Sequence, residues 1–276
     1  MESFFTFKHF TVFHDECAMK VGTDGTLLGA WAKVDHVDSV LDVGCGCGLI
    51  ALMIAQRSSA STIIGIDNHE PSIRQAARNT AASDWSDRLC IAFHDVRDLT
   101  VEEFGRFDLI VSNPPFYEED VSCPDISRNS ARHTGSLNFD QLVDAAVRLL
   151  SDNGTLSLIL PAKSRATFVG TAASRGLYLS RITSVYTKHG KPPKRVLMEF
   201  GRSITDTLEN NLYIYKCRGD GLSSPANKKD GLSSPEICRG GSCTRPQQNG
   251  SCTRPQQNVV FSEQYVDLLK DFYLNL

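Results

Sequence analysis

The sequence contains no run of about 20 consecutive apolar residues, the length that a helix needs to cross a bilayer. Its first ten residues, MESFFTFKHF, are apolar but have no basic start, no long hydrophobic core and no small-residue cleavage site, so we predict no signal peptide. A basic excess is also missing, because the formal net charge is −3. These absences argue against a membrane protein, and they leave only a local basic patch for any contact with nucleic acid.

The nine cysteines do not form a recognisable disulfide or metal pattern. Their number is odd, their spacing is irregular, and Cys45 and Cys47 lie within a glycine-rich segment. No second Cys or His pair follows at the spacing of a zinc site, which needs four such ligands. We therefore predict reduced thiols, no bound metal and a cytoplasmic protein.

Short apolar runs alternate with amphipathic stretches through the middle of the chain, as in a parallel sheet that is covered by helices. Helical spacing is clear at 141–150, and Pro71 stands where another helix begins. The last two apolar runs are joined by the non-helical segment 187–195, which predicts an antiparallel edge. We predict a single α/β domain with a doubly wound, mostly parallel, seven-stranded sheet. The predicted strands are 40–43, 62–66, 89–93, 107–112, 155–160, 179–186 and 196–200.

Two short motifs are repeated near the C-terminus. DGLSSP occurs at 220–225 and 230–235, and GSCTRPQQN occurs at 241–249 and 250–258. Two copies are too few for a solenoid, and a composition of Gly, Ser, Pro, Gln and Asn cannot bury a core. We divide the chain into an N-terminal cap at 1–39, the α/β domain at 40–217, a disordered insertion at 218–258, and a helix at 259–276 that docks back on the domain.

A glycine-rich turn follows the first predicted strand directly. The segment LDVGCGCG places Asp42, Gly44, Gly46 and Gly48 in a GxGxG pattern, which differs from the GxGxxG of dinucleotide-binding proteins. Glycines allow a tight turn and a close approach of the backbone to a ligand. Taken alone, the same pattern also fits a purely structural strand-to-helix turn.

Two acidic residues follow the next two strands. Asp67 ends the second strand, where a carboxylate can accept hydrogen bonds from both hydroxyls of a ribose. Asp95 follows the third strand, where it can reach an adenine amino group. Asp67 could instead cap a helix before Pro71. Because the glycines and both acids occur in order at the carboxyl ends of strands, we favour a nucleoside-binding site.

The fourth strand ends in the turn Asn113-Pro114-Pro115-Phe116, in which two prolines restrict the backbone. The Asn113 side-chain oxygen and the Pro114 carbonyl are two acceptors that can hold the two hydrogens of a planar NH₂ group. Fixed acceptors of this kind stabilise positive charge that develops on the nitrogen. Phe116 offers a ring on which a planar base can stack. The simpler alternative is a proline-rich turn without a catalytic role.

With these motifs in place, the chain resembles the class I amino-methyltransferases that carry an Asn-Pro-Pro-aromatic turn. Within them it is most similar to the bacterial tRNA-Val adenine-N6 methyltransferases, through CAMKVGTDGTLLGAWA at 17–32, ARHTGSL, KPPKRVLMEF and DFYLNL. The resemblance implies S-adenosylmethionine as the cofactor and the adenine 3′ of the anticodon as the target. It also implies that Lys20, Thr23 and Asp24 lie over the cofactor. The other cofactor-binding residues that we predict are Asp42, Asp67, Asp95, Asn113 and the three glycines of the turn.

The Asn-Pro-Pro-aromatic turn does not by itself identify the macromolecule. Similar turns serve enzymes that methylate a glutamine of peptide release factors or guanine N2 in ribosomal RNA. A cofactor-binding RNA assembly factor without turnover is a further alternative. A nicotinamide-dependent oxidoreductase is disfavoured, because GxGxG and the proline turn do not suit it.

Contact with the anticodon loop of tRNA would require a local basic patch, and one lies between the last two predicted strands. We predict that its side chains bind phosphates, although a solvated charged loop is the plainer alternative. The predicted tRNA-binding residues are Lys188, Lys191, Lys194, Arg195 and, after the catalytic turn, Arg132.

Overall fold

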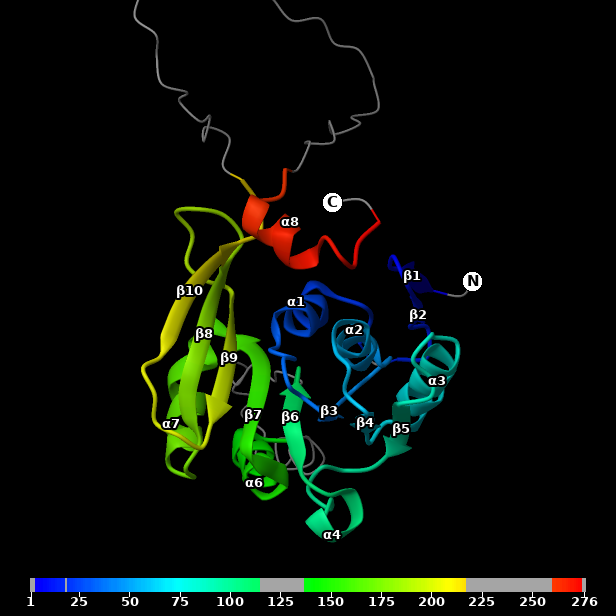
Figure 1. Cartoon of the computed structure of the whole chain (residues 1–276). Coiled ribbons are helices and arrows are strands. Elements are labelled where there is room, and N and C mark those ends of the chain that lie inside the picture. The colour runs from blue at the N-terminus through cyan, green and yellow to red at the C-terminus, as the bar shows by residue number, and fades with distance from the viewer. Residues whose placement is uncertain (1–2, 18, 115–136, 217–259, 275–276) are drawn as a thin grey trace, which may run out of the picture.

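The computed structural model describes residues 3–17, 19–114, 137–216 and 260–274, in which an eight-stranded sheet carries helices on both faces (Figure 1). The strands of this sheet are β3 (Ser39–Val43), β4 (Thr62–Asp67), β5 (Leu89–Phe93), β6 (Phe107–Ser112), β7 (Leu150–Pro161), β8 (Tyr178–Tyr186), β9 (Arg195–Gly201) and β10 (Leu208–Tyr213). The helices are α1 (Thr23–Trp31), α2 (Leu49–Arg57), α3 (Glu70–Ala81), α4 (Val101–Phe104), α6 (Phe139–Leu149), α7 (Arg165–Ala173) and α8 (Glu263–Leu269). A separate hairpin pairs β1 (Phe4–Thr6) with β2 (Thr11–Phe13).

The order of the strands is β10-β8-β9-β7-β6-β3-β4-β5, and only β9 runs antiparallel to its neighbours. The doubly wound α/β fold is thereby confirmed, as is the hairpin of β8 and β9. Two details of the prediction are wrong. In the described part of the chain the sheet has eight strands rather than seven, and the antiparallel strand lies between β7 and β8 rather than at the edge. The outermost strand, β10, has the sequence LENNLY and is mostly exposed, so it shows no apolar run.

Two hydrophobic layers cover the central strands of the sheet. Helices lie on both sides of it (Figure 1). Helices α1, α2, α3 and α8 lie on one face, and α4, α6 and α7 lie on the other. Neighbouring strand residues alternate between the layers, so Val40 belongs to the first and Leu41 to the second. Burial on both sides explains why these strands read as continuous apolar runs.

Two predicted helices are confirmed, one of them with its predicted proline start. Helix α6 begins with a capping box, in which Asn138 accepts from the backbone of Gln141 and the Gln141 side chain accepts from the Asn138 backbone. Its apolar face, including Leu142 and Leu149, is buried. Helix α3 begins at Glu70 and has Pro71 in its first turn.

The C-terminal helix α8 packs against α1 and β10. The Ser262 hydroxyl accepts a hydrogen bond from the backbone of Tyr265 at 3.1 Å and so caps the helix. Tyr265, Leu269 and Phe272 are buried. The repeated segment at 218–258 lies outside the described residues, and the division of the chain into four parts stays a prediction.

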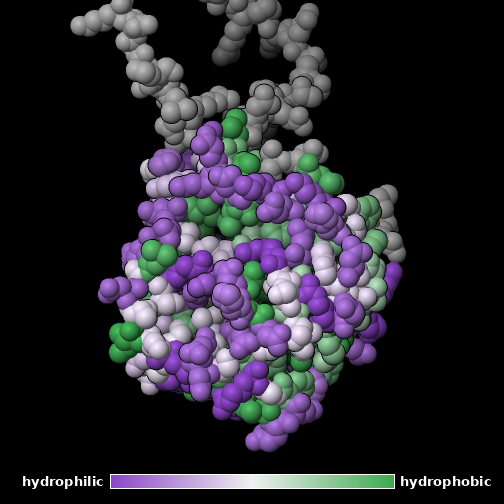
Figure 2. All heavy atoms as spheres, viewed as in Figure 1, coloured by the Kyte–Doolittle hydropathy of each residue, from purple (hydrophilic) through white to green (hydrophobic). Residues whose placement is uncertain are grey.

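The surface seen in Figure 2 is mostly hydrophilic, with scattered hydrophobic residues. Within the described part of the chain, no helix is long and apolar enough to span a membrane.

Candidate functional site

The predicted site lies at the edge of the sheet where the parallel strands end, called here the carboxyl edge. Val43 of β3 and Ser112 of β6 are paired across the sheet, and the Ser112 hydroxyl donates to the Val43 carbonyl at 2.9 Å. The residues that follow them are Gly44 and Asn113. Since neighbouring strands lie about 4.8 Å apart, the glycine turn and the Asn-Pro-Pro turn start side by side.

The turn between β3 and α2 needs its glycines. Gly44, Gly46 and Gly48 have φ values of 72°, 54° and 78°, in the left-handed region that other residues rarely adopt. The backbone N–H groups of Gly44 and Cys45 both donate to the Ile66 carbonyl at 2.9 Å, which ties the turn to β4. A Cβ atom at Gly44 or Gly46 would meet nothing within 4 Å, so open space adjoins this backbone. A Cβ at Gly48 would lie 3.4 Å from the Ala76 side chain, so this glycine serves helix packing.

Asp67, the last residue of β4, holds the glycine turn. Its Oδ2 accepts from the Gly46 backbone at 3.0 Å and its Oδ1 accepts from the His69 backbone at 2.9 Å. Each carboxylate oxygen keeps a second acceptor position for a ligand hydroxyl. The alternative role as a helix cap is wrong, because His69 is the N-cap of α3 and accepts from the Ser72 backbone at 3.3 Å.

Asp42 is fully buried within β3. Its Oδ2 accepts from the Ala51 backbone at 3.1 Å, and its Oδ1 has no hydrogen-bond partner among the described residues. Burial raises the pKa of Asp42 to about 7; the Ala51 hydrogen bond lowers this pKa, and the charge of Asp67 adds to the rise. Asp42 therefore anchors the start of α2 and carries an acceptor oxygen that the described protein leaves unused.

Asp95 follows β5 and is paired with Arg97. The guanidinium binds both carboxylate oxygens, with Nε 2.9 Å from Oδ1 and Nη2 2.6 Å from Oδ2. These hydrogen bonds are the main reason that the pKa of Asp95 lies below its usual value. Any contact of Asp95 with a ligand must use acceptor capacity that Arg97 leaves over.

Asn113 is half-buried after β6, and Pro114 is buried beside it. The Asn113 Oδ1 atom is inaccessible to solvent and has no hydrogen-bond partner among the residues that the structure describes. A buried, unsatisfied acceptor costs free energy, so its place is consistent with a ligand donor. Pro115, Phe116 and Arg132 lie outside the described residues.

Helix α1 packs closely on α2 through two glycines. A Cβ at Gly25 would lie 3.2 Å from Leu49 Cδ2, and one at Gly29 would lie 2.8 Å from Met53 Sδ. This contact brings the first turn of α1, with exposed Thr23 and half-buried Asp24, beside the start of α2 and its glycine turn.

The two sides of the site are linked by an ion pair. The Arg195 Nε lies 2.7 Å from the Asp24 Oδ2, and both side chains are partly buried. Arg195 starts β9, so this pair connects the basic loop before β9 with the first turn of α1. Lys20, the third residue that the resemblance places over the cofactor, is exposed.

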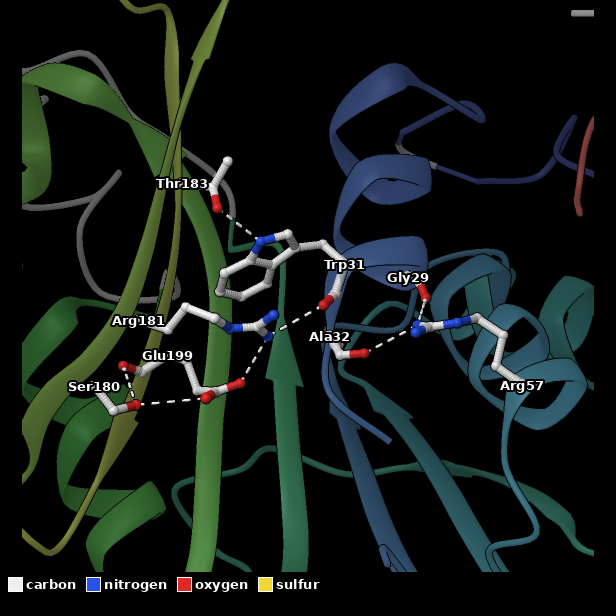
Figure 3. Close-up of polar contacts among 8 residues, drawn as sticks. All are labelled: Gly29, Trp31, Ala32, Arg57, Ser180, Arg181, Thr183 and Glu199. Carbon is white, nitrogen blue, oxygen red and sulfur yellow. Dashed lines mark hydrogen bonds and ion pairs between the residues drawn. The ribbon is translucent and has the colours of Figure 1, made fainter. Parts of the chain in front are cut away.

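The C-terminal end of α1 is held by a cluster that sequence patterns did not indicate (Figure 3). The Arg181 guanidinium lies 3.6 Å from the centroid of the Trp31 ring, donates to the Trp31 carbonyl at 3.1 Å and pairs with Glu199 at 2.8 Å. The Trp31 indole N–H donates to the Thr183 hydroxyl at 2.9 Å. The cluster thus fixes α1 to β8 and β9.

A second arginine holds the same end of α1 from α2. The Arg57 Nη1 donates to the carbonyls of Gly29 and Ala32 at 2.8 and 2.9 Å (Figure 3). Cations at a helix C-terminus satisfy its last carbonyls and interact favourably with the helix dipole. No local pattern marks Arg57 or Arg181, because their partners are distant in sequence.

Asn79 of α3 is another contributor that sequence reasoning missed. Its amide donates to the Cys47 carbonyl at 2.9 Å, inside the glycine turn, and to the Phe13 carbonyl at 2.8 Å. Its Oδ1 accepts from the Phe13 backbone at 3.1 Å. Asn79 therefore joins the N-terminal hairpin to the glycine turn.

The predicted basic loop lies at the carboxyl edge. Strand β8 runs in the same direction as β7, because both are antiparallel to β9, so the loop after β8 emerges on the side of the glycine turn. Lys188, Lys191 and Lys194 are exposed in it, whereas Arg195 is engaged with Asp24. Within the described ranges, no three His, Cys, Asp or Glu side chains form a group that could hold a metal; the absence of a metal stays a prediction.

Comparison with known proteins identifies the family. Residues 17–169 match the family model described as the methyltransferase small domain. A tRNA1(Val) (adenine(37)-N6)-methyltransferase of Phocaeicola vulgatus is 41% identical, covering 99% of this chain and 98% of its own. Proteins of the same name are 44% identical in Bacteroides fragilis, covering 76% and 89%, and 39% identical in Yersinia pestis, covering 85% and 90%. The chain belongs to this family of methyltransferases.

Solved structures agree with the fold. A predicted O-methyltransferase from Agrobacterium tumefaciens superposes with a TM-score of 0.54 at 20% identity, covering 74% of this chain and 92% of its own. At this level of identity the likeness concerns the fold alone. The resemblance drawn from the Asn-Pro-Pro turn and the segment around Lys20 is confirmed at the level of the family.

Proposed function

We propose that this protein transfers a methyl group from S-adenosylmethionine to N6 of an adenine in tRNA, at the position 3′ of the anticodon of tRNA-Val. The relatives that match most of the chain carry the name of this activity. The observation that carries the proposal is the buried Oδ1 of Asn113, which has no hydrogen-bond partner among the described residues. Asn113 follows β6, and Ser112 of β6 is hydrogen-bonded to Val43, the residue before the glycine turn.

The residues at the carboxyl edge suit this cofactor. Open space adjoins Gly44 and Gly46, and Asp67 retains acceptor capacity that suits ribose hydroxyls. When bound there, S-adenosylmethionine supplies an electrophilic methyl group on a sulfonium. The residues that we propose to hold it are Lys20, Thr23, Asp24, Asp42, Gly44, Gly46, Gly48, Asp67, Asp95 and Asn113.

The chemical task of the protein is to orient a weak nucleophile. The lone pair of an adenine amino group is delocalised into the ring, so attack requires the nitrogen to become pyramidal. In our proposal Asn113 Oδ1 and the Pro114 carbonyl accept the two amine hydrogens, which turns the lone pair towards the methyl group. Acceptors fixed in advance also stabilise the positive charge that grows on nitrogen. Pro115 stiffens the turn, Phe116 stacks on the base, and the proton of the product leaves to water.

We further propose that Arg132, Lys188, Lys191, Lys194 and Arg195 bind the tRNA. Phosphate contacts of this kind make affinity fall with added salt. An anticodon-loop base is already partly unstacked, so turning it towards Asn113 costs less than in a duplex. A cytoplasmic location belongs to the same proposal, and it agrees with the free thiols of Cys17, Cys45, Cys47 and Cys90.

Labelled S-adenosylmethionine tests the proposal directly. The protein is incubated separately with unmodified tRNA-Val, ribosomal RNA and a release factor, and the labelled product is digested and identified. We expect N6-methyladenosine from tRNA-Val, and none when the adenine 3′ of the anticodon is replaced by guanine. Label found only in the release factor, or only in guanine, would identify one of the alternative targets instead of tRNA adenine. Cofactor binding without any transferred label would indicate an assembly factor.

A further inference from the structure

The loop after β8 contains a tight turn with three exposed side chains. The backbone of Lys191 donates to the Lys188 carbonyl at 3.4 Å, and Gly190 has a φ of 75°. This turn projects Lys188, His189 and Lys191 into solvent. Its backbone is tied to the sheet, since Lys194 donates to the Val185 carbonyl at 2.8 Å and Tyr215 donates to the Thr187 carbonyl at 3.0 Å.

The His189 ring is the outer member of a stack of three rings. Its centroid lies 3.7 Å from that of Tyr213, with an angle of 13° between the ring planes. On β8, Tyr186 stacks on Tyr213 with centroids 4.9 Å apart at 23°. Both tyrosines are half-buried, whereas His189 is exposed. The stack therefore holds an exposed imidazole in one orientation, although an exposed side chain would otherwise rotate freely.

The loop that carries this ring is basic. Residues 187–194 contain Lys188, Lys191 and Lys194 and no acidic residue. Lys188, Lys191 and Lys194 form no ion pair within the described part of the chain. Such a surface attracts a polyanion, and the phosphate backbone of RNA is one.

The position of the stack relative to the catalytic turn is also suitable. Strands β8 and β6 end at the same edge and are three positions apart in the sheet. At the usual spacing of neighbouring strands this separation is about 14 Å. A folded RNA loop can cover such a distance, so one molecule could engage both the stack and Asn113.

We propose that His189, supported by Tyr213 and Tyr186, is a stacking platform for one unpaired base of the RNA substrate, with Lys188 and Lys191 contacting the adjacent phosphates. The inference rests on the proposed function and adds a second contact point to it. Proteins bind single-stranded RNA by stacking unpaired bases on aromatic or histidine rings and by placing cations along the backbone. A ring that is ordered before binding loses little further entropy when the base arrives.

The test is the affinity for tRNA-Val, measured by fluorescence anisotropy over a series of salt concentrations. We expect His189→Ala to weaken binding about 5- to 100-fold with an unchanged salt slope, because stacking involves no counterion release. His189→Phe keeps a flat ring and should bind within about three-fold of the wild type. Lys191→Ala should lower the slope of log Kd against log salt by about 0.7. Lys33→Ala, an exposed lysine at the opposite edge of the sheet, is the matched control and should leave the slope unchanged.

Three outcomes overturn the platform. The first is wild-type tRNA affinity in His189→Ala, and the second is a loss that His189→Phe does not restore. The third is that His189→Ala loses affinity for a release factor and keeps its affinity for tRNA, which would make this surface a protein-binding site. Methyl transfer by the wild type is measured in the same preparations. If the wild type methylates tRNA and His189→Ala binds normally, only the platform fails; if the wild type does not methylate tRNA, the proposed function fails.

Discussion

The backbone N–H of Gly46 donates to the carboxylate of Asp67 at 3.0 Å, so the acid that ends β4 holds the turn that follows β3. The same carboxylate accepts from the His69 backbone at the start of α3. One side chain thereby connects two strand ends and a helix. The glycine turn and Asp67 are therefore parts of one unit.

The first prediction concerns Gly46→Ala. The change forces a left-handed conformation on alanine and adds a methyl group to the open space beside the turn. Gly176→Ala is the matched control. Gly176 also has a positive φ, and a Cβ added there would meet nothing within 4 Å, but this residue precedes β8 at the opposite edge of the sheet. Both variants should lose about 1–2 kcal/mol of unfolding free energy. Only Gly46→Ala should weaken S-adenosylmethionine binding in calorimetry, by about ten-fold or more, since steric blocking of a ligand by even one methyl is costly.

The second prediction concerns Asn113→Ala, which removes the acceptor Oδ1. We expect turnover on tRNA to fall about 100- to 1000-fold, the usual effect of losing one fixed transition-state contact. The dissociation constant of S-adenosylmethionine should change less than about three-fold, because the lost contact acts mainly on the amine. Turnover is measured with labelled cofactor and binding by calorimetry. Full turnover in this variant would remove Asn113 from the catalytic machinery.

The third prediction uses the buried Asp42. Its pKa of about 7 in the folded protein lies above the usual aspartate value of 3.8, so the unfolded chain loses this proton first as pH rises. The resulting loss of stability therefore develops between about pH 4 and pH 7 and stays constant above that, with an upper bound of roughly 4 kcal/mol. Asp42→Asn cannot ionise, so its unfolding free energy should fall less than that of the wild type between pH 5 and pH 8. The unfolding free energies are measured by urea titration at each pH. If they change with pH in parallel for the two proteins, Asp42 does not titrate in this range.

The fourth prediction concerns the cluster at the end of α1. Arg181→Met leaves Glu199 without its cation in a site where only 9% of its side chain is exposed, and it removes the contact with Trp31. Loss of one partner of a buried pair costs about 3–5 kcal/mol. Arg165→Met is the control, since the Arg165–Glu209 pair is exposed and should contribute less than about 1 kcal/mol. Denaturant unfolding compares the two, and equal losses would contradict a special role of the Arg181 cluster.

Much of the fold could be predicted from the sequence because its signals are local. The seven apolar runs correspond to strands, the helical spacing at 141–150 and the proline start at Pro71 correspond to α6 and α3, and the glycines of the turn have positive φ. Placing Gly44, Asp67 and Asn113 at one edge required only that parallel strands end on the same side.

The remaining features depend on contacts between distant parts of the chain. Strand β10 has too few buried residues to show an apolar run, and its pairing with β8 is a tertiary choice. Asp24 and Arg195 are 171 positions apart, and Trp31 and Arg181 are 150 apart. No periodicity or turn rule relates such residues.

The sequence by itself therefore determined the fold class, the glycine turn and the place of Asn113, because backbone sterics and hydrophobic periodicity act over a few residues. Only the tertiary structure decided that Arg181 and Arg57 hold α1, that buried Asp42 keeps an acceptor without a partner among the described residues, and that His189 stacks on Tyr213. These relationships arise from side-chain packing after the sheet has assembled, and such packing is set by three-dimensional neighbours rather than by sequence neighbours.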